Sequence, residues 1–329
     1  MRQFLRAPFP GVFTAASLTS TLCAQRSDSS GVNVEVCLGD VESVVEAVAA
    51  GASRVELCDS LSEGGTTPSL GAIAGAVTIA RGSDTKINVL IRPRAGDFCF
   101  TKREVDVMVA DIDAARLAGV HGVVIGALTP DGSLDLPTLK RLIAAAKSER
   151  WTVMGAPEQS KTDRIVPLQP LTVTFHRAFD LCADPIATLE QLHALEINCS
   201  GKSERAIDYI LTSGQASSAW EGRDTLRLLQ TKLHELNGGT TRFMRLIAGA
   251  GVNADNAAAL VSSTGIEDIH AGSALQNEIV SPSRVARASR NGSGGSGKSV
   301  SMGHGSAERE HLIKRTCASK VRGLIEVVK

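Results

Sequence analysis

Short apolar runs alternate with amphipathic stretches along the chain from about residue 32. Each run is rich in Val, Ile and Leu, and each is followed by a turn and then by apolar residues at helical spacing. This alternation predicts parallel strands joined by crossover helices. The predicted strands are residues 32–37, 54–58, 86–92, 121–126, 171–176, 208–213, 243–248 and 267–270. The predicted helices lie near residues 40–50, 69–80, 103–118, 135–148, 185–196, 222–236 and 253–263.

Eight such strand–helix units, the last with a late helix, favour an α/β fold of the (β/α)8 TIM-barrel type over an open doubly wound sheet in a chain of 329 residues. No G-x-G-x-x-G follows the first strand, which also weakens the dinucleotide-binding alternative. We expect Asp40 to cap the first helix and Gly51 to end it. Two stretches, near 150–170 and 198–207, look like loops inserted into the regular plan.

The predicted single-domain barrel occupies residues 31–280 and is flanked by segments of different composition. Residues 1–30 contain several Arg, Ser and Thr but no acidic residue before Asp28, which fits an organelle transit peptide and a disordered tail equally. Residues 281–310 are rich in Ser, Gly and Arg and are typical of a flexible segment. Within residues 311–329 apolar positions recur at helical spacing, so we expect the eighth helix there, packed back on the barrel.

The charge balance and the cysteine spacing indicate which classes of partner and which cellular compartment to expect. The 35 Lys and Arg residues balance 35 Asp and Glu residues, whereas a dedicated nucleic-acid binder normally has an excess of positive charge. No run of 18 or more uncharged apolar residues is present, so we expect a soluble protein without a membrane partner. The seven cysteines lack the short, even spacing of a secreted disulfide framework, which indicates a reducing compartment. We therefore expect a cytoplasmic protein, unless residues 1–30 direct it to a mitochondrion or another organelle.

Two carboxylates and two thiols are predicted to face the barrel interior. The first two strands read Val-Glu-Val-Cys and Val-Glu-Leu-Cys, and the two-residue period of a strand places each glutamate on the same face as its cysteine. Because the apolar residues face the helices, Glu35, Cys37, Glu56 and Cys58 point inward. Buried carboxylates cost several kcal/mol unless they are paired, so other groups must compensate them.

Arg92 and Arg94 after the third strand and His176 after the fifth are candidates for that compensation. The cluster is either a self-satisfied ion network or an acid/base site, in which Glu35, Glu56, Arg92 and His176 are the catalytic candidates. Arginine binds carboxylate and phosphate well, and barrels often hold phosphate after strands seven and eight. The predicted residues for a small anionic or phosphorylated ligand are Arg92, Arg94, Thr212, Ser213, Gly249, Gly251 and Gly272.

The cysteines and glycines of this set also have ordinary structural explanations. A buried cysteine usually behaves as a small hydrophobic residue, and glycines are required in tight turns. Two thiols on neighbouring strands nevertheless suit a soft cation such as Cu(I), for which thiolate is the preferred ligand type.

Several long segments, in a fixed order, resemble the CutC copper homeostasis family. They are VEVC, RVELCDSLSEGGTTPSLG, LIRPRAGDFCF, GVVIGALTPDGSLD, VTFHRAFD, ILTSG and AGAGVNADN, within residues 32–275. The resemblance implies a (β/α)8 barrel, copper binding with a role in intracellular copper homeostasis, a mainly cytoplasmic location and homo-oligomers. It also implies that Cys37 and Cys58 are the Cu(I) ligands, since they match cysteines proposed for that role in eukaryotic relatives.

Two positions depart from the family pattern. The usual run of three glycines after strand seven is Ala-Gly-Ala-Gly at 248–251, and Ala271 stands where a cysteine can follow the strand-eight histidine. A third thiolate is therefore absent from that position, and copper needs either the two thiolates alone or help from His176 or another polar neighbour.

Three hypotheses follow from these residues. Non-enzymatic copper binding, with Cu(I) as the bound cofactor, is favoured and depends on the thiols. A barrel enzyme acting on a small anionic ligand depends instead on the carboxylates and Arg92. A non-catalytic scaffold would use the segments 1–30 and 281–308 for partner contacts.

Overall fold

The computed structural model describes residues 31–148, 169–199, 202–238, 244–280 and 312–329. The segments predicted at 1–30 and 281–310, and most of the insertion near 150–170, lie outside the described residues.

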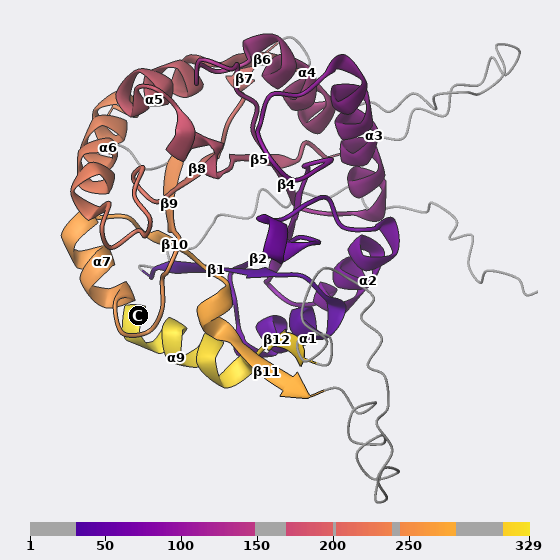
Figure 1. Ribbon diagram of the computed structural model, residues 1–329, viewed down its shortest axis with the longest axis vertical. Coiled ribbons are helices and arrows are strands. Elements are labelled where there is room, and N and C mark those ends of the chain that lie inside the picture. Colours follow the sequence, from indigo (N-terminus) through magenta and orange to yellow (C-terminus); the bar gives the residue numbers. More distant parts are fainter. Residues whose placement is uncertain (1–30, 149–168, 200–201, 239–243, 281–311) are drawn as a thin grey trace, which may run out of the picture. The chain divides into compact units, whose positions relative to one another are not determined.

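Eight parallel strands form a closed barrel, which confirms the predicted fold class. Each lies within or overlaps a strand region predicted from the apolar runs, and the order around the barrel follows the chain. Figure 1 shows these strands inside a ring of helices. The barrel strands are β1 (Asn33–Leu38), β2 (Arg54–Leu57), β3 (Lys86–Leu90), β4 (Gly122–Ile125), β5 (Thr172–Phe175), β8 (Tyr209–Thr212), β9 (Arg245–Gly249) and β10 (Asp268–Ala271).

Five of the eight described helices of the ring begin at a residue whose side chain caps them, and α6, α7 and α9 do not. The Asp40 carboxylate accepts a hydrogen bond from the Ser43 amide, and Gly51 ends the same helix in the left-handed conformation, so both predicted caps are confirmed. Thr101 and Glu104 form a reciprocal capping box. The helices are α1 (Val41–Ala50), α2 (Leu70–Ala80), α3 (Lys102–Ala118), α4 (Leu136–Lys147), α5 (Pro185–Ala194), α6 (Arg223–Leu236), α7 (Ala257–Thr264) and α9 (Ala318–Val328).

Short elements extend the loops between strands and helices. Three 3-10 helices are η1 (Leu61–Glu63), η2 (Arg177–Leu181) and η3 (Ser273–Leu275). Two antiparallel two-stranded sheets among the described residues lie outside the barrel, formed by β6 (Glu196–Cys199) with β7 (Lys202–Arg205) and by β11 (Gln276–Val280) with β12 (Leu312–Thr316).

Two predictions about these outer segments are wrong in detail. The stretch 198–207 is not simply a loop, because it contributes to the two-stranded sheet of β6 and β7. The last helix begins at Ala318 rather than near 311, because residues 312–316 pair with β11 as a strand. The apolar stripe that predicted the helix is confirmed, since Val321 and Leu324 are fully buried.

The apolar core lies mainly between the strands and the helix ring. Val34, Val36 and Leu38 of β1 face this layer and are almost completely buried. Their inward-facing neighbours are polar, so the first strand combines an ordinary hydrophobic face with an unusual charged one. Burial of the outer face holds the strand in place and thereby fixes the direction of its inward side chains.

Gly126 directly follows β4, and a side chain added there would show how closely the barrel mouth is packed. A Cβ atom there would lie 2.4 Å from Cε1 of His176. We predict that Gly126→Ala lowers the free energy of unfolding by about 1–3 kcal/mol through overpacking. Gly323→Ala is the control, because a Cβ at this position in α9 meets nothing within 4 Å, and it should stabilise the protein by about 0.5–1 kcal/mol. Urea unfolding measures both, and equal effects of the two substitutions would contradict the packing argument.

Candidate functional site

A buried carboxylate joins four neighbouring strands inside the barrel. Glu35 on β1 is fully buried, and the strand register places it opposite Arg54 of β2 and His270 of β10. Its Oε2 accepts hydrogen bonds from Arg54 Nε at 3.0 Å and from Asn88 Nδ2, on β3, at 3.2 Å. Its Oε1 lies 2.9 Å from His270 Nδ1. Glu35 therefore has partners on β2, β3 and β10.

The charge of Arg54 is shared with a second buried carboxylate. Arg54 Nη1 lies 2.8 Å from Asp268 Oδ1, and Arg245 Nη2 lies 2.8 Å from Asp268 Oδ2. The Arg54 guanidinium also stacks over the Tyr209 ring at 4.7 Å. Charges of opposite sign thus alternate from β1 through β2 and β10 to β9, and the buried acids are compensated.

The expectation that Arg92 compensates the glutamates is wrong. Arg54, Asp268 and His270 fill that part of the barrel, and the sequence analysis gave none of them a role there. The two-residue period could have identified them, because Arg54 precedes the inward Glu56 by two residues and Asp268 precedes His270 by two.

The two inward glutamates have pKa values shifted in opposite directions. Burial opposes ionisation of Glu35, but the hydrogen bond from His270 and the charge of Arg54 outweigh it and lower the pKa to about 2. Burial, together with the nearby Cys37, raises the pKa of Glu56 well above its ordinary value. His270 Nε2 lies 3.5 Å from Glu56 Oε2, so the imidazole stands between one carboxyl group whose pKa is lowered and one whose pKa is raised.

The two predicted thiols lie side by side. Cys37 Sγ is 3.9 Å from Cys58 Sγ; the Cys58 side chain is buried and Cys37 is partly exposed. The hydrogen bond from Cys58, acting against burial, lowers the pKa of Cys37 to about 5, while the same contact and burial raise that of Cys58. Glu56 offers a carboxylate oxygen within 4.8 Å of both sulfur atoms.

The spacing of the thiols fits a single soft metal ion. With thiolate–metal bonds of about 2.3 Å, sulfur atoms 3.9 Å apart subtend an angle of about 115° at the metal. Such an ion could contact both sulfur atoms without a shift of either strand.

His176 and Arg92 lie together at the mouth but contact neither glutamate in an ion pair. His176 Nδ1 accepts a hydrogen bond from the Ala178 amide at 3.1 Å, and burial together with the charge of Arg92 lowers the histidine pKa to about 3. Arg92 donates to the carbonyl oxygens of Glu63, Gly65 and Gly96. The guanidinium therefore holds two loops together.

Other predicted anion-binding donors already bind carboxylates of the protein. Arg94 pairs with Asp97 and Glu104. Thr212 Oγ1 and Ser213 Oγ donate to Asp180 at 2.5 and 3.0 Å. A ligand on these donors would have to displace Asp97, Glu104 or Asp180, and their role in ligand binding stays a prediction.

The three predicted glycines have packing or turn roles. Added Cβ atoms would lie 2.6 Å from Leu211 Cδ1 at Gly249 and 3.3 Å from Cys37 Cβ at Gly272. Gly251 has a φ of +70°, and its carbonyl accepts a hydrogen bond from Asn256 Nδ2 at 2.9 Å. Gly272 thus makes room for a thiol, and anion binding by these glycines stays a prediction.

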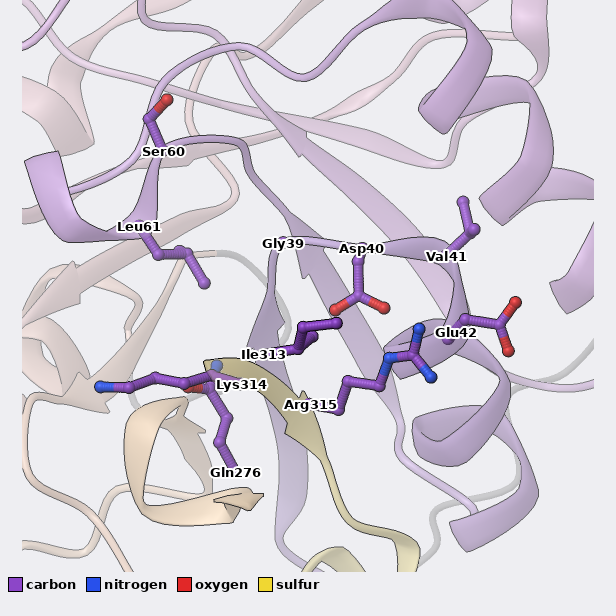
Figure 2. Close-up of a pocket in the computed structure, with 10 residues that line it drawn as sticks. All are labelled: Gly39, Asp40, Val41, Glu42, Ser60, Leu61, Gln276, Ile313, Lys314 and Arg315. Carbon is purple, nitrogen blue, oxygen red and sulfur yellow. The ribbon is translucent and has the colours of Figure 1, made fainter. Parts of the chain in front are cut away.

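A cavity of about 470 Å³ lies at the side of the mouth, where the sequence predicted no site. Figure 2 shows the side chains of Ile313 and Arg315 of β12 on the side of Asp40, while the Lys314 side chain extends away from it. None of the cysteines or buried glutamates lines it. Across the described residues, no helix has both the length and the apolar composition needed to span a membrane.

Known proteins are similar to this chain in sequence and in fold. The sequence profile of the CutC family matches residues 32–156 and 158–275. The chain is 41% identical over 239 residues to a CutC family protein of Pasteurella multocida, covering 73% of this chain and 81% of the relative. It is 37% identical over 296 residues to one of Chromobacterium violaceum, covering 90% and 97%. The solved structure of CutC from Streptococcus agalactiae, whose name refers to copper homeostasis, is similar with a TM-score of 0.59 and 26% identity, covering 73% of this chain and 98% of that one.

The lowered pKa of Glu35 predicts a pH-dependent contribution to stability. Because the folded-state pKa is about 2 against an ordinary value of 4.5, ionised Glu35 contributes about 3 kcal/mol above pH 4.5, and this contribution is lost as the pH falls toward 2. Glu35→Gln should therefore destabilise the protein at pH 7, and its difference from wild type should shrink below pH 4.5. Urea unfolding between pH 7 and 3 measures this.

The exposed Glu326 of α9 provides the control for this experiment. Glu326→Gln should leave stability nearly unchanged at every pH. A wild-type to Glu35→Gln difference that stays constant from pH 7 to 3 would show that the carboxylate charge is not what stabilises the barrel.

Proposed function

The chain belongs to the CutC family, and from that premise we propose that it binds Cu(I) through Cys37 and Cys58 and takes part in intracellular copper homeostasis. The observation that supports this most directly is the 3.9 Å separation of the two sulfur atoms. The site lies at the carboxyl ends of β1 and β2, the end at which barrels of this type place their functional residues.

The surroundings of the thiols suit a soft cation. The lowered pKa of Cys37 makes a thiolate available at neutral pH, and a second thiolate forms when the metal displaces the proton of Cys58. Burial of Cys58 excludes water from one side of the ion, while the partly exposed Cys37 leaves a route from solvent.

Glu56, rather than His176, is the neighbour placed to assist the two thiolates. Among the described residues, Glu56 forms a close group with both sulfur atoms, and His176 does not belong to that group. Because carboxylate is a hard ligand, its contribution is smaller than that of sulfur. Copper binding in this chain therefore rests on two thiolates, with Ala271 unable to supply a third. A cytoplasmic location and homo-oligomeric assembly are part of the same proposal.

A second candidate function is acid/base catalysis on a small molecule. The observation that favours it is the pair Glu35 and Glu56, whose pKa values are moved apart by their surroundings and which His270 connects. In that function a protonated Glu56 would donate a proton, and an ionised Glu35 would orient His270.

Competition titration with a Cu(I) chelator tests the copper proposal on the reduced protein. Wild type should bind one equivalent tightly, and Cys37→Ser/Cys58→Ser should lose more than about 100-fold in affinity, beyond what loss of a supporting group costs. Cys182→Ser is the matched control, because Cys182 is also buried but lies outside the group formed by Cys37, Cys58 and Glu56. Equal Cu(I) affinity in the double variant and wild type would rule the site out.

Glu56→Gln separates the two candidate functions. Because the proposed ligands are the two thiolates, and burial together with Cys37 raises the pKa of Glu56, replacing its carboxyl group by an amide of the same shape should leave tight Cu(I) binding in place. A proton-transfer reaction that depends on Glu56 should instead fall by about 100-fold or more. Loss of Cu(I) binding in Glu56→Gln to the level of the double cysteine variant would contradict the two-thiolate site.

A further inference from the structure

Two buried N–H groups at the barrel mouth lack a hydrogen-bond partner among the described residues. They are Nε of Arg92 and Nε2 of His176. The two side chains are 6% and 5% exposed, so solvent does not satisfy these atoms freely. Buried polar atoms are nearly always paired, and each exception requires an explanation.

The backbone fixes His176 Nε2 as a donor. His176 Nδ1 accepts a hydrogen bond from the Ala178 amide, which can only donate. A neutral imidazole has one protonated nitrogen, so the hydrogen is on Nε2. Burial and the charge of Arg92 keep the ring neutral, because both lower its pKa. The same hydrogen, together with the adjacent positive charge, makes Nε2 unsuitable as a metal ligand.

Arg92 supplies a second donor and a positive charge that is not held in an ion pair with any described carboxylate. Its Nη1 donates to the carbonyls of Glu63 and Gly65, and its Nη2 donates to that of Gly96. Carbonyl groups satisfy hydrogen bonds but supply no net charge. Within the described part of the chain, Arg92 forms no ion pair with a carboxylate, unlike Arg54 and Arg94.

The two donors lie beside one aromatic ring. The Phe98 ring centroid is 4.9 Å from Cζ of Arg92 and 4.7 Å from the centre of the His176 ring. Arg92 and His176 follow β3 and β5, which flank β4, and the intervening Gly126 contributes no side chain. Phe98 itself is only partly buried, while its carbonyl accepts a hydrogen bond from the Leu128 amide. Its ring can therefore turn toward solvent while the loop stays in place.

We propose that Arg92 and His176 bind a small oxyanion, a carboxylate or a phosphate group, which enters when the Phe98 ring turns outward. An oxyanion accepts hydrogen bonds from both N–H groups and neutralises the arginine, whereas a neutral molecule or a water satisfies only the hydrogen bonds. The donors of Arg94, Thr212 and Ser213 are not part of this site, because protein carboxylates already occupy them.

The oxyanion site adjoins the thiols through Gly65. The carbonyl of Gly65 accepts from Arg92 at 2.8 Å, and a Cβ on Gly65 would lie 3.7 Å from Cys58 Sγ. The inference does not depend on copper. It rests on the second candidate function, acid/base catalysis, and it names small carboxylates or phosphate esters as the substrate class of that function.

Calorimetric titration of the copper-free full chain with acetate and with inorganic phosphate tests the site, using sodium chloride at matched ionic strength as the reference. We expect saturable binding of at least one oxyanion and none of chloride. His176→Phe keeps an aromatic ring but removes the donor, and it should weaken binding about tenfold or more. Phe98→Ala should strengthen binding by uncovering both donors. The control is His234→Phe on the exposed surface of α6, which should bind like wild type.

Arg92→Gln is the second variant, in case His176→Phe does not fold; it keeps a hydrogen-bond donor and removes the charge. Preference for acetate identifies a carboxylate ligand, preference for phosphate identifies a phosphorylated one, and both support the site. Absence of saturable binding in wild type and in Phe98→Ala overturns the proposal, as does equal affinity in wild type, His176→Phe and Arg92→Gln. Because the readout is binding without copper or turnover, its failure leaves the copper titration and the catalytic hypothesis separately testable.

Discussion

The buried carboxylate of Glu35 is the constraint on which the barrel interior depends. Other barrels of this type fill their interior mainly with Val, Ile and Leu. Here Arg54, Asn88 and His270 must all point toward one carboxylate, which ties β1 to the strands around it. Removing one partner would leave a buried charge without compensation, and such a loss typically costs 3–5 kcal/mol. The charged face of β1 therefore limits the position of the strand as strictly as its apolar face does.

The same constraint determines the chemistry of the mouth. Because Glu35 holds His270 through Nδ1, the other side of the imidazole lies toward Glu56 and Cys37. The hydrogen bond from Cys58 and the fixed imidazole lower the pKa of Cys37, while burial raises the pKa of the neighbouring Glu56 well above its ordinary value. The ion pairs of Glu35 at the centre of the barrel and the groups at its end, Glu56 and Cys37, thus belong to one hydrogen-bonded cluster.

The regular elements could be predicted from the sequence because their signals are local. Alternating apolar runs located the eight barrel strands, and the two-residue period correctly turned Cys37 and Cys58 inward. The partners of buried groups could not be obtained in the same way. Arg54 rather than Arg92 binds Glu35 because of strand register, and Asp180 of η2 reaches Thr212 and Ser213, which are 32 and 33 residues away in the chain. The strand at 312–316 was missed because its partner β11 precedes a long segment.

The late position of α9 in the chain has a consequence for the order in which the protein is made. This helix packs against α1, α7 and β1, and the Ala318 amide donates to Glu46 of α1. During synthesis, the strand with Glu35 and Cys37 emerges among the first barrel elements, yet the part of it that packs against α9 stays uncovered until residues 318–328 have left the ribosome. The contact between α9 and α1 forms between residues some 270 positions apart in the chain. A nascent chain therefore has its thiols exposed well before it has the barrel that shelters them.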